Sequence, residues 1–312
     1  MQKIFIIFAV IVLSFTVSAQ MKERDLQFIT DEPVAASATQ TAPDASKAVN
    51  YIELNRLGVE KALVGKNYKE ASVLFSKAVE AAPDCLKCRF NLGRSFLALE
   101  NMDEAIRVFN EILKVKPDDF EANASLGEAY NLKGQFEESL AYFEKSLKIN
   151  SKDPIMLSNY AVSLTMIEKH KEALELLDKA VTIQPTFAEA YSNRGYSLFL
   201  LGRHKDALES LRKAEKLNPN IAQVHNNLGV VLDELGKKKE ARAHYEKAVE
   251  LKADYGAAIC NLAISNLEEG NREAAYKHLK TLEKVDFKLA GQLREVIWGK
   301  YVVDASKVKD KD

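Results

Sequence analysis

The chain repeats itself with a period of 34 residues, and this periodicity constrains its fold more than any other feature. Shifting the sequence by 34 positions aligns the segments that begin at Leu86, Phe120, Ala188 and Ala222. A fixed period of this length is typical of repeat proteins, in which one unit cannot bury its own apolar faces. Seven units, beginning at residues 52, 86, 120, 154, 188, 222 and 256, are therefore predicted to stack into a solenoid.

Small and large residues alternate at fixed positions of the unit. The eighth position is small, as at Gly93 and Gly229, with Val59 as the exception, and the twenty-fourth is large, as at Phe109 and Tyr245. A small residue facing a large one lets two helices pack closely. Each unit is therefore expected to fold as two antiparallel helices.

A unit that carries Leu92-Gly93 followed by Ala105, Phe109 and Pro117 resembles the tetratricopeptide repeat. The resemblance implies an all-α, right-handed superhelical solenoid of antiparallel helix pairs, with the first helix of each pair lining a concave groove. In the segment after residue 289, Leu293, Val296 and Ile297 share one helical stripe. This stripe predicts a C-terminal capping helix over the last open core.

The chain is expected to divide into four parts. Residues 1–19 read as a signal peptide, because Lys3 precedes a short apolar run that ends in Val17-Ser18-Ala19. Cleavage near Ala19 would release the chain into the periplasm or the medium, and an uncleaved segment would anchor it to the membrane. Residues 20–51 are predicted to be a flexible linker, 52–289 the seven repeats, and 290–312 the capping helix and tail.

Charge narrows the class of partner. Lys and Arg number 44 and Asp and Glu number 45, so the formal net charge is −1. Nucleic-acid binding normally requires a basic surface, and the sequence has no long block of one sign to supply it. The expected partner is a protein or peptide.

An asparagine recurs at the sixth position of five units: Asn91, Asn159, Asn193, Asn227 and Asn261. Leu57 and Ser125 stand at that position in the first and third units. The segments around these asparagines are similar to the tetratricopeptide region of O-linked N-acetylglucosamine transferase, which implies that the amides pair with the backbone of an extended peptide. The alternative is that they bond neighbouring helices and stiffen the stack.

Further candidates for the peptide-binding groove lie between the asparagines. Arg94 edges an apolar track to which Tyr196, Phe199 and Val230 contribute. Tyr196 and Phe199 are the expected anchors, because aromatic side chains bring a large contact area at low entropic cost.

The sequence predicts no catalytic or metal site. Cys85 and Cys88 could close a disulfide or remain thiols, and the nearby sequence supplies no histidine for haem attachment and no further zinc ligands. His225, His244 and His278 are scattered along the sequence, and no catalytic triad or phosphate-binding loop is present. We therefore expect no enzyme activity and no cofactor.

These observations favour an exported scaffold whose groove binds extended segments of partner proteins. The competing hypothesis is a structural module of an envelope assembly that self-associates and has no peptide ligand. The sequence is compatible with a homo-oligomer and does not identify the partner.

Overall fold

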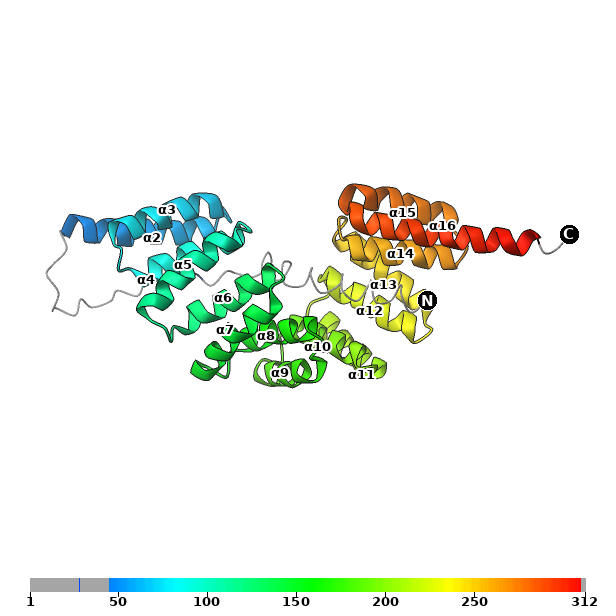
Figure 1. Ribbon diagram of the computed structural model, residues 1–312, viewed down its shortest axis with the longest axis horizontal. Helices are drawn as coiled ribbons and strands as arrows, with labels where there is room; N and C mark the ends of the chain where they lie inside the picture. The colour runs from blue at the N-terminus through cyan, green and yellow to red at the C-terminus, as the bar shows by residue number, and fades with distance from the viewer. Residues whose placement is uncertain (1–27, 29–44, 310–312) are drawn as a thin grey trace. The chain divides into compact units, whose positions relative to one another are not determined.

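The computed structural model describes residue 28 and residues 45–309, and over these residues its regular structure is entirely helical (Figure 1). The predicted all-α fold of consecutive helix pairs is confirmed. The helices are α2 (Ala45–Leu63), α3 (Tyr68–Ala81), α4 (Leu86–Ala98), α5 (Met102–Val115), α6 (Phe120–Leu132), α7 (Phe136–Ile149), α8 (Pro154–Met166), α9 (His170–Ile183), α10 (Ala188–Leu200), α11 (His204–Leu217), α12 (Ala222–Glu234), α13 (Lys238–Leu251), α14 (Gly256–Glu268), α15 (Arg272–Val285) and α16 (Phe287–Lys309).

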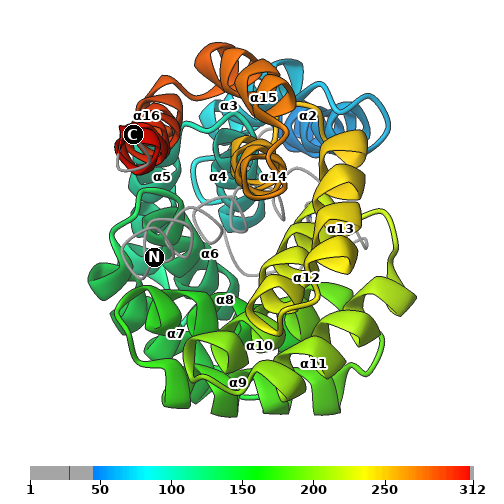
Figure 2. The ribbon, with the colours of Figure 1, turned by 90° about the vertical axis from the view of Figure 1, so that its right-hand side faces the viewer.

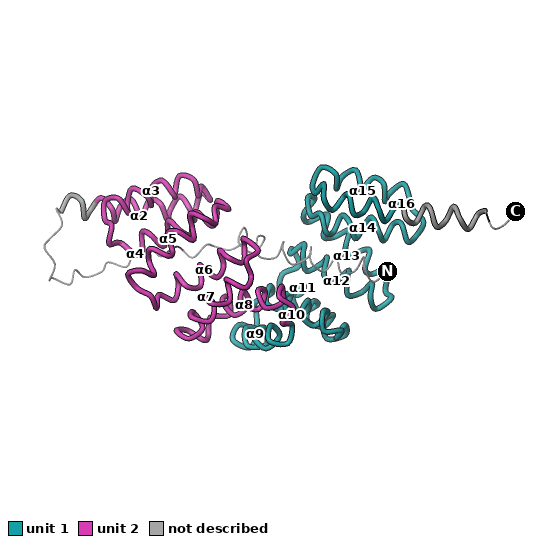
Figure 3. Tube along the Cα trace, in the orientation of Figure 1, with its two compact units in different colours: residues 1–13, 170–312 teal, residues 14–169 magenta. Residues whose placement is uncertain are grey.

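The helices form two compact units, which Figure 3 colours separately. Unit 2 contains α2 to α8, and unit 1 contains α9 to α16. Within each unit every helix packs against the next one along the chain, and first helices of successive repeats also touch, as α4 and α6 do in unit 2 and α12 and α14 do in unit 1. Such nearest-neighbour packing is the architecture of a repeat solenoid.

Glycines in the first helices make room for large side chains of the second. A Cβ atom built on Gly93 would lie 2.5 Å from Cε1 of Phe109, and one built on Gly127 would lie 2.7 Å from Cε1 of Phe143. Both rings are fully buried. The predicted pairing of a small eighth residue with a large twenty-fourth residue therefore describes the core of each repeat.

The first repeat departs from the predicted register. Gly58, not Val59, packs against the ring of Phe75, as Gly93 packs against Phe109. The turn between α2 and α3 thus holds one residue more than the turns of the later repeats. The prediction that Val59 and Leu57 occupy the eighth and sixth positions was wrong, because the inserted residue shifts α2 by one.

The predicted linker is shorter than residues 20–51. Helix α2 begins at Ala45, so the last residues assigned to the linker are helical. Phe28 is buried, and its ring stacks on Phe75 with 5.7 Å between centroids. Residue 28 therefore belongs to the core of the first repeat. The signal-peptide prediction for residues 1–19 lies outside the described residues.

The last helix, α16, packs against α14 and α15, and the three lie side by side in Figures 1 and 2. Leu293 and Ile297 are buried in the apolar cluster that these helices share, and Val296 packs at its edge. Trp298 lies on the exposed side of the helix. Among the described residues, no helix is both long and apolar enough to cross a membrane.

Candidate functional site

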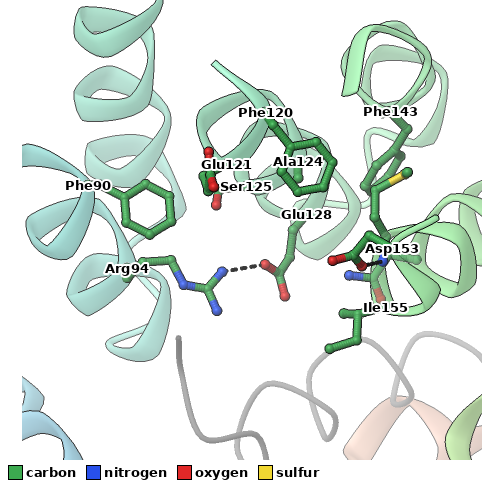
Figure 4. A pocket seen from close by; sticks show the side chains of 12 residues that line it. Phe90, Arg94, Phe120, Glu121, Ala124, Ser125, Glu128, Phe143, Asp153 and Ile155 are labelled. Atoms are coloured by element: carbon green, nitrogen blue, oxygen red, sulfur yellow. Dashed lines mark hydrogen bonds and ion pairs between the residues drawn. The ribbon is translucent and has the colours of Figure 1, made fainter. Parts of the chain in front are cut away.

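A cavity of about 280 Å³ lies on the first helices of unit 2 (Figure 4). Most of its lining comes from α4, α6 and α8, and Phe143 reaches it from the second helix α7. The lining residues are Phe90, Arg94, Phe120, Glu121, Ala124, Ser125, Glu128, Phe143, Asp153, Ile155, Met156 and Asn159. The cavity therefore combines aromatic and aliphatic walls with a few polar groups.

A buried ion pair crosses this cavity. Nη1 of Arg94 on α4 donates to Oε2 of Glu128 on α6 at 2.6 Å, and only 8% of each side chain is exposed. Figure 4 shows the two side chains pointing toward one another between Phe90 and Ile155. The residues are 34 positions apart, so they occupy the same position in successive repeats. Arg94 was predicted from the sequence as a groove residue, but its pairing with Glu128 was not, although the 34-residue spacing of the two opposite charges could have indicated it.

Tyr160 packs behind the cavity, against the lining residue Phe143. Tyr160 on α8 stacks on Phe143 and donates its hydroxyl hydrogen to Oε1 of Glu144 at 3.2 Å. Burial and the neighbouring carboxylate raise the pKa of Tyr160 to about 12, so its phenol stays protonated at neutral pH.

The two predicted asparagines of unit 2 have different surroundings. Asn91 is fully buried, and its Nδ2 donates to Oδ1 of Asn55 in the preceding repeat at 2.9 Å. In this structure the Asn91 amide therefore joins two consecutive repeats. Asn159 lines the cavity, and its backbone oxygen accepts from Nδ2 of Asn131 at 3.0 Å.

In unit 1, Asn261 repeats the geometry of Asn91. Its Nδ2 donates to Oδ1 of Asn226 at 2.9 Å, so an asparagine at the sixth position again pairs with the fifth position of the preceding repeat. Asn91 and Asn261 therefore both bond the neighbouring helix of the preceding repeat. Asn193 is buried as well, with 4% of its surface exposed.

Asn227 breaks this pairing rule. The fifth position before it is Ser192, and neither the Ser192 hydroxyl nor either polar atom of the Asn227 amide has a hydrogen-bond partner among the described residues. A serine side chain is shorter than those of Asn55 and Asn226, which stand at this place before Asn91 and Asn261. Because unpaired buried polar groups cost about 1–3 kcal/mol each, a water molecule or a ligand is expected to bond them.

The predicted apolar anchors of unit 1 are only partly accessible. Tyr196 is 6% exposed, and its burial raises the pKa of its phenol. Its ring packs against Phe199, with 6.5 Å between centroids, and Phe199 in turn packs against His204. Phe199 and Val230 are half-buried. Tyr196 is therefore a core residue in this structure, and Phe199 and Val230 present the apolar surface.

Cys85 and Cys88 form a disulfide at the start of α4. Sγ of Cys85 also accepts a hydrogen bond from the backbone N–H of Cys88, at the N-terminus of the helix. Cys260 is a free, buried thiol, and burial raises its pKa to about 12. At neutral pH its thiolate population is negligible, so Cys260 is a poor nucleophile.

The interpretation of the histidines as scattered was wrong for two of them. The rings of His225 on α12 and His244 on α13 stack with 5.4 Å between centroids. Burial is the main reason that the pKa of His244 lies below its usual value. Helix packing brings these residues together from 19 positions apart, which no local spacing motif in the sequence indicated.

Family comparisons agree with the fold. Two family profiles described as tetratricopeptide repeat match the chain, one over residues 186–254 and the other over residues 62–119 and 90–154. No curated protein matches the chain significantly.

Solved structures are similar in fold at low sequence identity. A tetratricopeptide repeat protein from Parabacteroides merdae has a TM-score of 0.66 and 14% identity, covering 80% of this chain and 99% of that one. PilF of Pseudomonas aeruginosa has a TM-score of 0.58 and 17% identity, covering 71% and 98%. A chain of the Cut9–Hcn1 assembly has a TM-score of 0.66 and 13% identity, covering 80% and 52%.

Proposed function

Because the chain belongs to the tetratricopeptide repeat family, whose members are generally non-enzymatic scaffolds for protein or peptide partners, we propose that it is an exported scaffold that binds extended peptide segments on its first helices. The observation that carries the proposal is the cavity between α4, α6 and α8.

The size and lining of the cavity suit part of a peptide. Sites for drug-sized ligands usually measure about 300–1,000 Å³. A cavity of about 280 Å³ is at the lower limit of this range and accommodates one or two side chains of a guest. Phe90, Phe120 and Ile155 supply apolar contact area, and the Asn159 amide and Glu121 supply polar partners at its edge. A side chain bound here would be held by shape, with polar groups fixing its orientation.

Filling the cavity should abolish most of the binding. Peptides selected on the purified chain from a displayed random library would be labelled, and their affinities measured by fluorescence anisotropy. Ala124 is half-buried and lines the cavity, so Ala124→Phe is expected to weaken binding at least about tenfold, which corresponds to about 1.4 kcal/mol.

The matched control adds the same ring elsewhere in unit 2. Val73 on α3 is 50% exposed and does not line the cavity, so Val73→Phe should leave affinity unchanged. Equal affinity of the wild type and a correctly folded Ala124→Phe protein would contradict the proposal.

Asn227 and Asn261 should respond differently to removal of the amide. Asn261→Ala leaves the buried Asn226 oxygen without its donor, so the free energy of unfolding should fall by about 1–3 kcal/mol. Asn227→Ala removes no hydrogen bond to another described residue and leaves no protein group without its partner, so it should destabilise the fold less than Asn261→Ala does.

Urea titration of the two variants measures the difference. Equal losses of stability in Asn227→Ala and Asn261→Ala would show that the Asn227 amide is hydrogen-bonded inside the folded protein.

Export is part of the proposal and rests on two observations. The first 19 residues have the arrangement of a signal peptide, and Cys85 and Cys88 are joined in a disulfide. Disulfides persist in the periplasm and outside the cell. Amino-terminal sequencing of the protein purified from its native envelope fraction should begin at Gln20, and a sequence beginning at Met1 would argue against cleavage.

A further inference from the structure

Three side chains with metal-binding atoms meet in unit 1. Glu215 comes from the end of α11, His225 from α12 and His244 from α13. Nδ1 of His225 lies 3.2 Å from Nδ1 of His244. Oε1 of Glu215 lies 3.7 Å from the first of these nitrogens and 4.0 Å from the second. The three atoms therefore form a compact triangle.

A backbone carbonyl orients one of the two rings. Nε2 of His225 lies 2.8 Å from the oxygen of Pro219, and a carbonyl oxygen only accepts hydrogen bonds. Nε2 therefore carries the hydrogen, which leaves the lone pair of Nδ1 directed toward His244. Histidines that bind metals usually donate their other ring N–H to a carbonyl or carboxylate in this way. His225 is only 5% exposed, so its orientation is held by packing as well.

We propose that Glu215, His225 and His244 bind a divalent transition-metal ion of the zinc type. Zinc bonds to nitrogen measure about 2.0–2.1 Å, and two ligands of a tetrahedral ion are consequently about 3.3 Å apart. The two histidine nitrogens, at 3.2 Å, already have this separation. Oε1 of Glu215 must move toward the two histidine nitrogens by less than about 1 Å to reach a zinc–oxygen distance of about 2.0–2.2 Å. Its side chain is 33% exposed and can move.

The surroundings favour a cation and allow its entry. The nearby charges of Arg212 and Glu240 offset one another, because Nη2 of Arg212 lies 3.7 Å from Oε2 of Glu240. Glu215 therefore supplies a net negative charge to the cluster. His244 is 24% exposed, so an ion can enter from the solvent, and water would complete the coordination.

The ion would link consecutive repeats. Glu215 belongs to the second helix of one repeat, and the two histidines belong to both helices of the next. Metal bonds across this junction would hold α12 against α11, and α12 carries Asn227 and Val230 of the proposed peptide-binding face. The site is independent of peptide binding, so each proposal can fail without the other.

Calorimetric titration of the purified chain, without a polyhistidine tag, with ZnCl₂ tests the site. One ion is expected per chain, and Co²⁺ should give the absorption bands of a low-symmetry, four-coordinate ion. His244→Ala should weaken Zn²⁺ binding at least about a hundredfold and Glu215→Gln at least about tenfold, in line with the loss of a ligand. His278→Ala removes a half-buried histidine of α15 outside the cluster and should leave affinity unchanged.

Circular dichroism of the metal-free variants separates loss of the site from loss of the fold. Glu215→Gln preserves side-chain volume, so weaker binding by this variant with unchanged helicity supports the site. The absence of saturable binding to the wild type would overturn the proposal. So would equal binding by the wild type and His244→Ala, because that result assigns the ion to surface carboxylates.

Discussion

Replacing Arg94 by methionine should lower the free energy of unfolding of unit 2 by about 3–5 kcal/mol. The substitution leaves the Glu128 carboxylate buried without the guanidinium that lies 2.6 Å away. Breaking a buried ion pair by removing one partner is strongly destabilising, because the remaining charge has lost its solvation and its counter-charge. Urea titration followed by far-ultraviolet circular dichroism measures the change.

The double variant Arg94→Met, Glu128→Leu is the decisive control. Apolar residues of similar volume avoid the cost of burying charges, so the double variant should be more stable than Arg94→Met alone. A Lys133→Met variant removes an exposed pair with Asp103, and it should change stability by less than about 1 kcal/mol. If Arg94→Met behaves like this surface variant, water solvates Glu128 and the pair is not buried in solution.

The second large effect is expected at Gly93. Helix propensity alone predicts that Gly93→Ala stabilises α4 by about 0.5–1 kcal/mol. In the structure, however, the new methyl group would lie 2.5 Å from Cε1 and 2.7 Å from Cζ of Phe109, whose ring is fully buried. Overpacking of this kind costs about 1–3 kcal/mol, so Gly93→Ala should destabilise unit 2. The same urea titration shows whether the free energy of unfolding rises or falls in Gly93→Ala.

Two comparisons isolate the steric effect. A methyl group added at Gly291 in α16 would meet no atom within 4 Å beyond its own helix and chain neighbours, so Gly291→Ala should be neutral or stabilising. Phe109→Leu in the Gly93→Ala background should recover part of the loss, because Ala263 and Leu279 already coexist in the core of unit 1. No recovery in the double variant would show that the methyl group meets backbone instead of the ring.

The sequence predicted those cavity residues whose place follows from their position in a first helix of the repeat. Position in the unit named Arg94 and Asn159, and both line the cavity of unit 2. The repeat position did not indicate that Phe143 lines the cavity. This residue belongs to a second helix, and its ring reaches the cavity past Gly127. The register also failed in the first repeat, where one added turn residue moves Gly58 to the eighth position.

The asparagines show why a shared position does not fix a shared role. Asn91 and Asn261 pair with an asparagine of the preceding repeat, whereas Asn227 faces the shorter Ser192 and has no such partner. Whether an amide is paired depends on the length of a side chain 35 or 36 residues away. The periodicity gives the direction in which each asparagine side chain points. The residue that it faces in the preceding repeat decides whether its amide is hydrogen-bonded.

The repeat pattern was enough to predict the all-α architecture, because a 34-residue unit with small and large residues at fixed positions has one efficient way to bury its faces. Which residues of different repeats meet follows only from the packing of the helices. This packing brought together His225 and His244, which no spacing motif relates, and it aligned their nitrogens with Glu215. Such contacts depend on the separation of packed helices to within about 1 Å, and residue types along the chain do not specify distances at that scale.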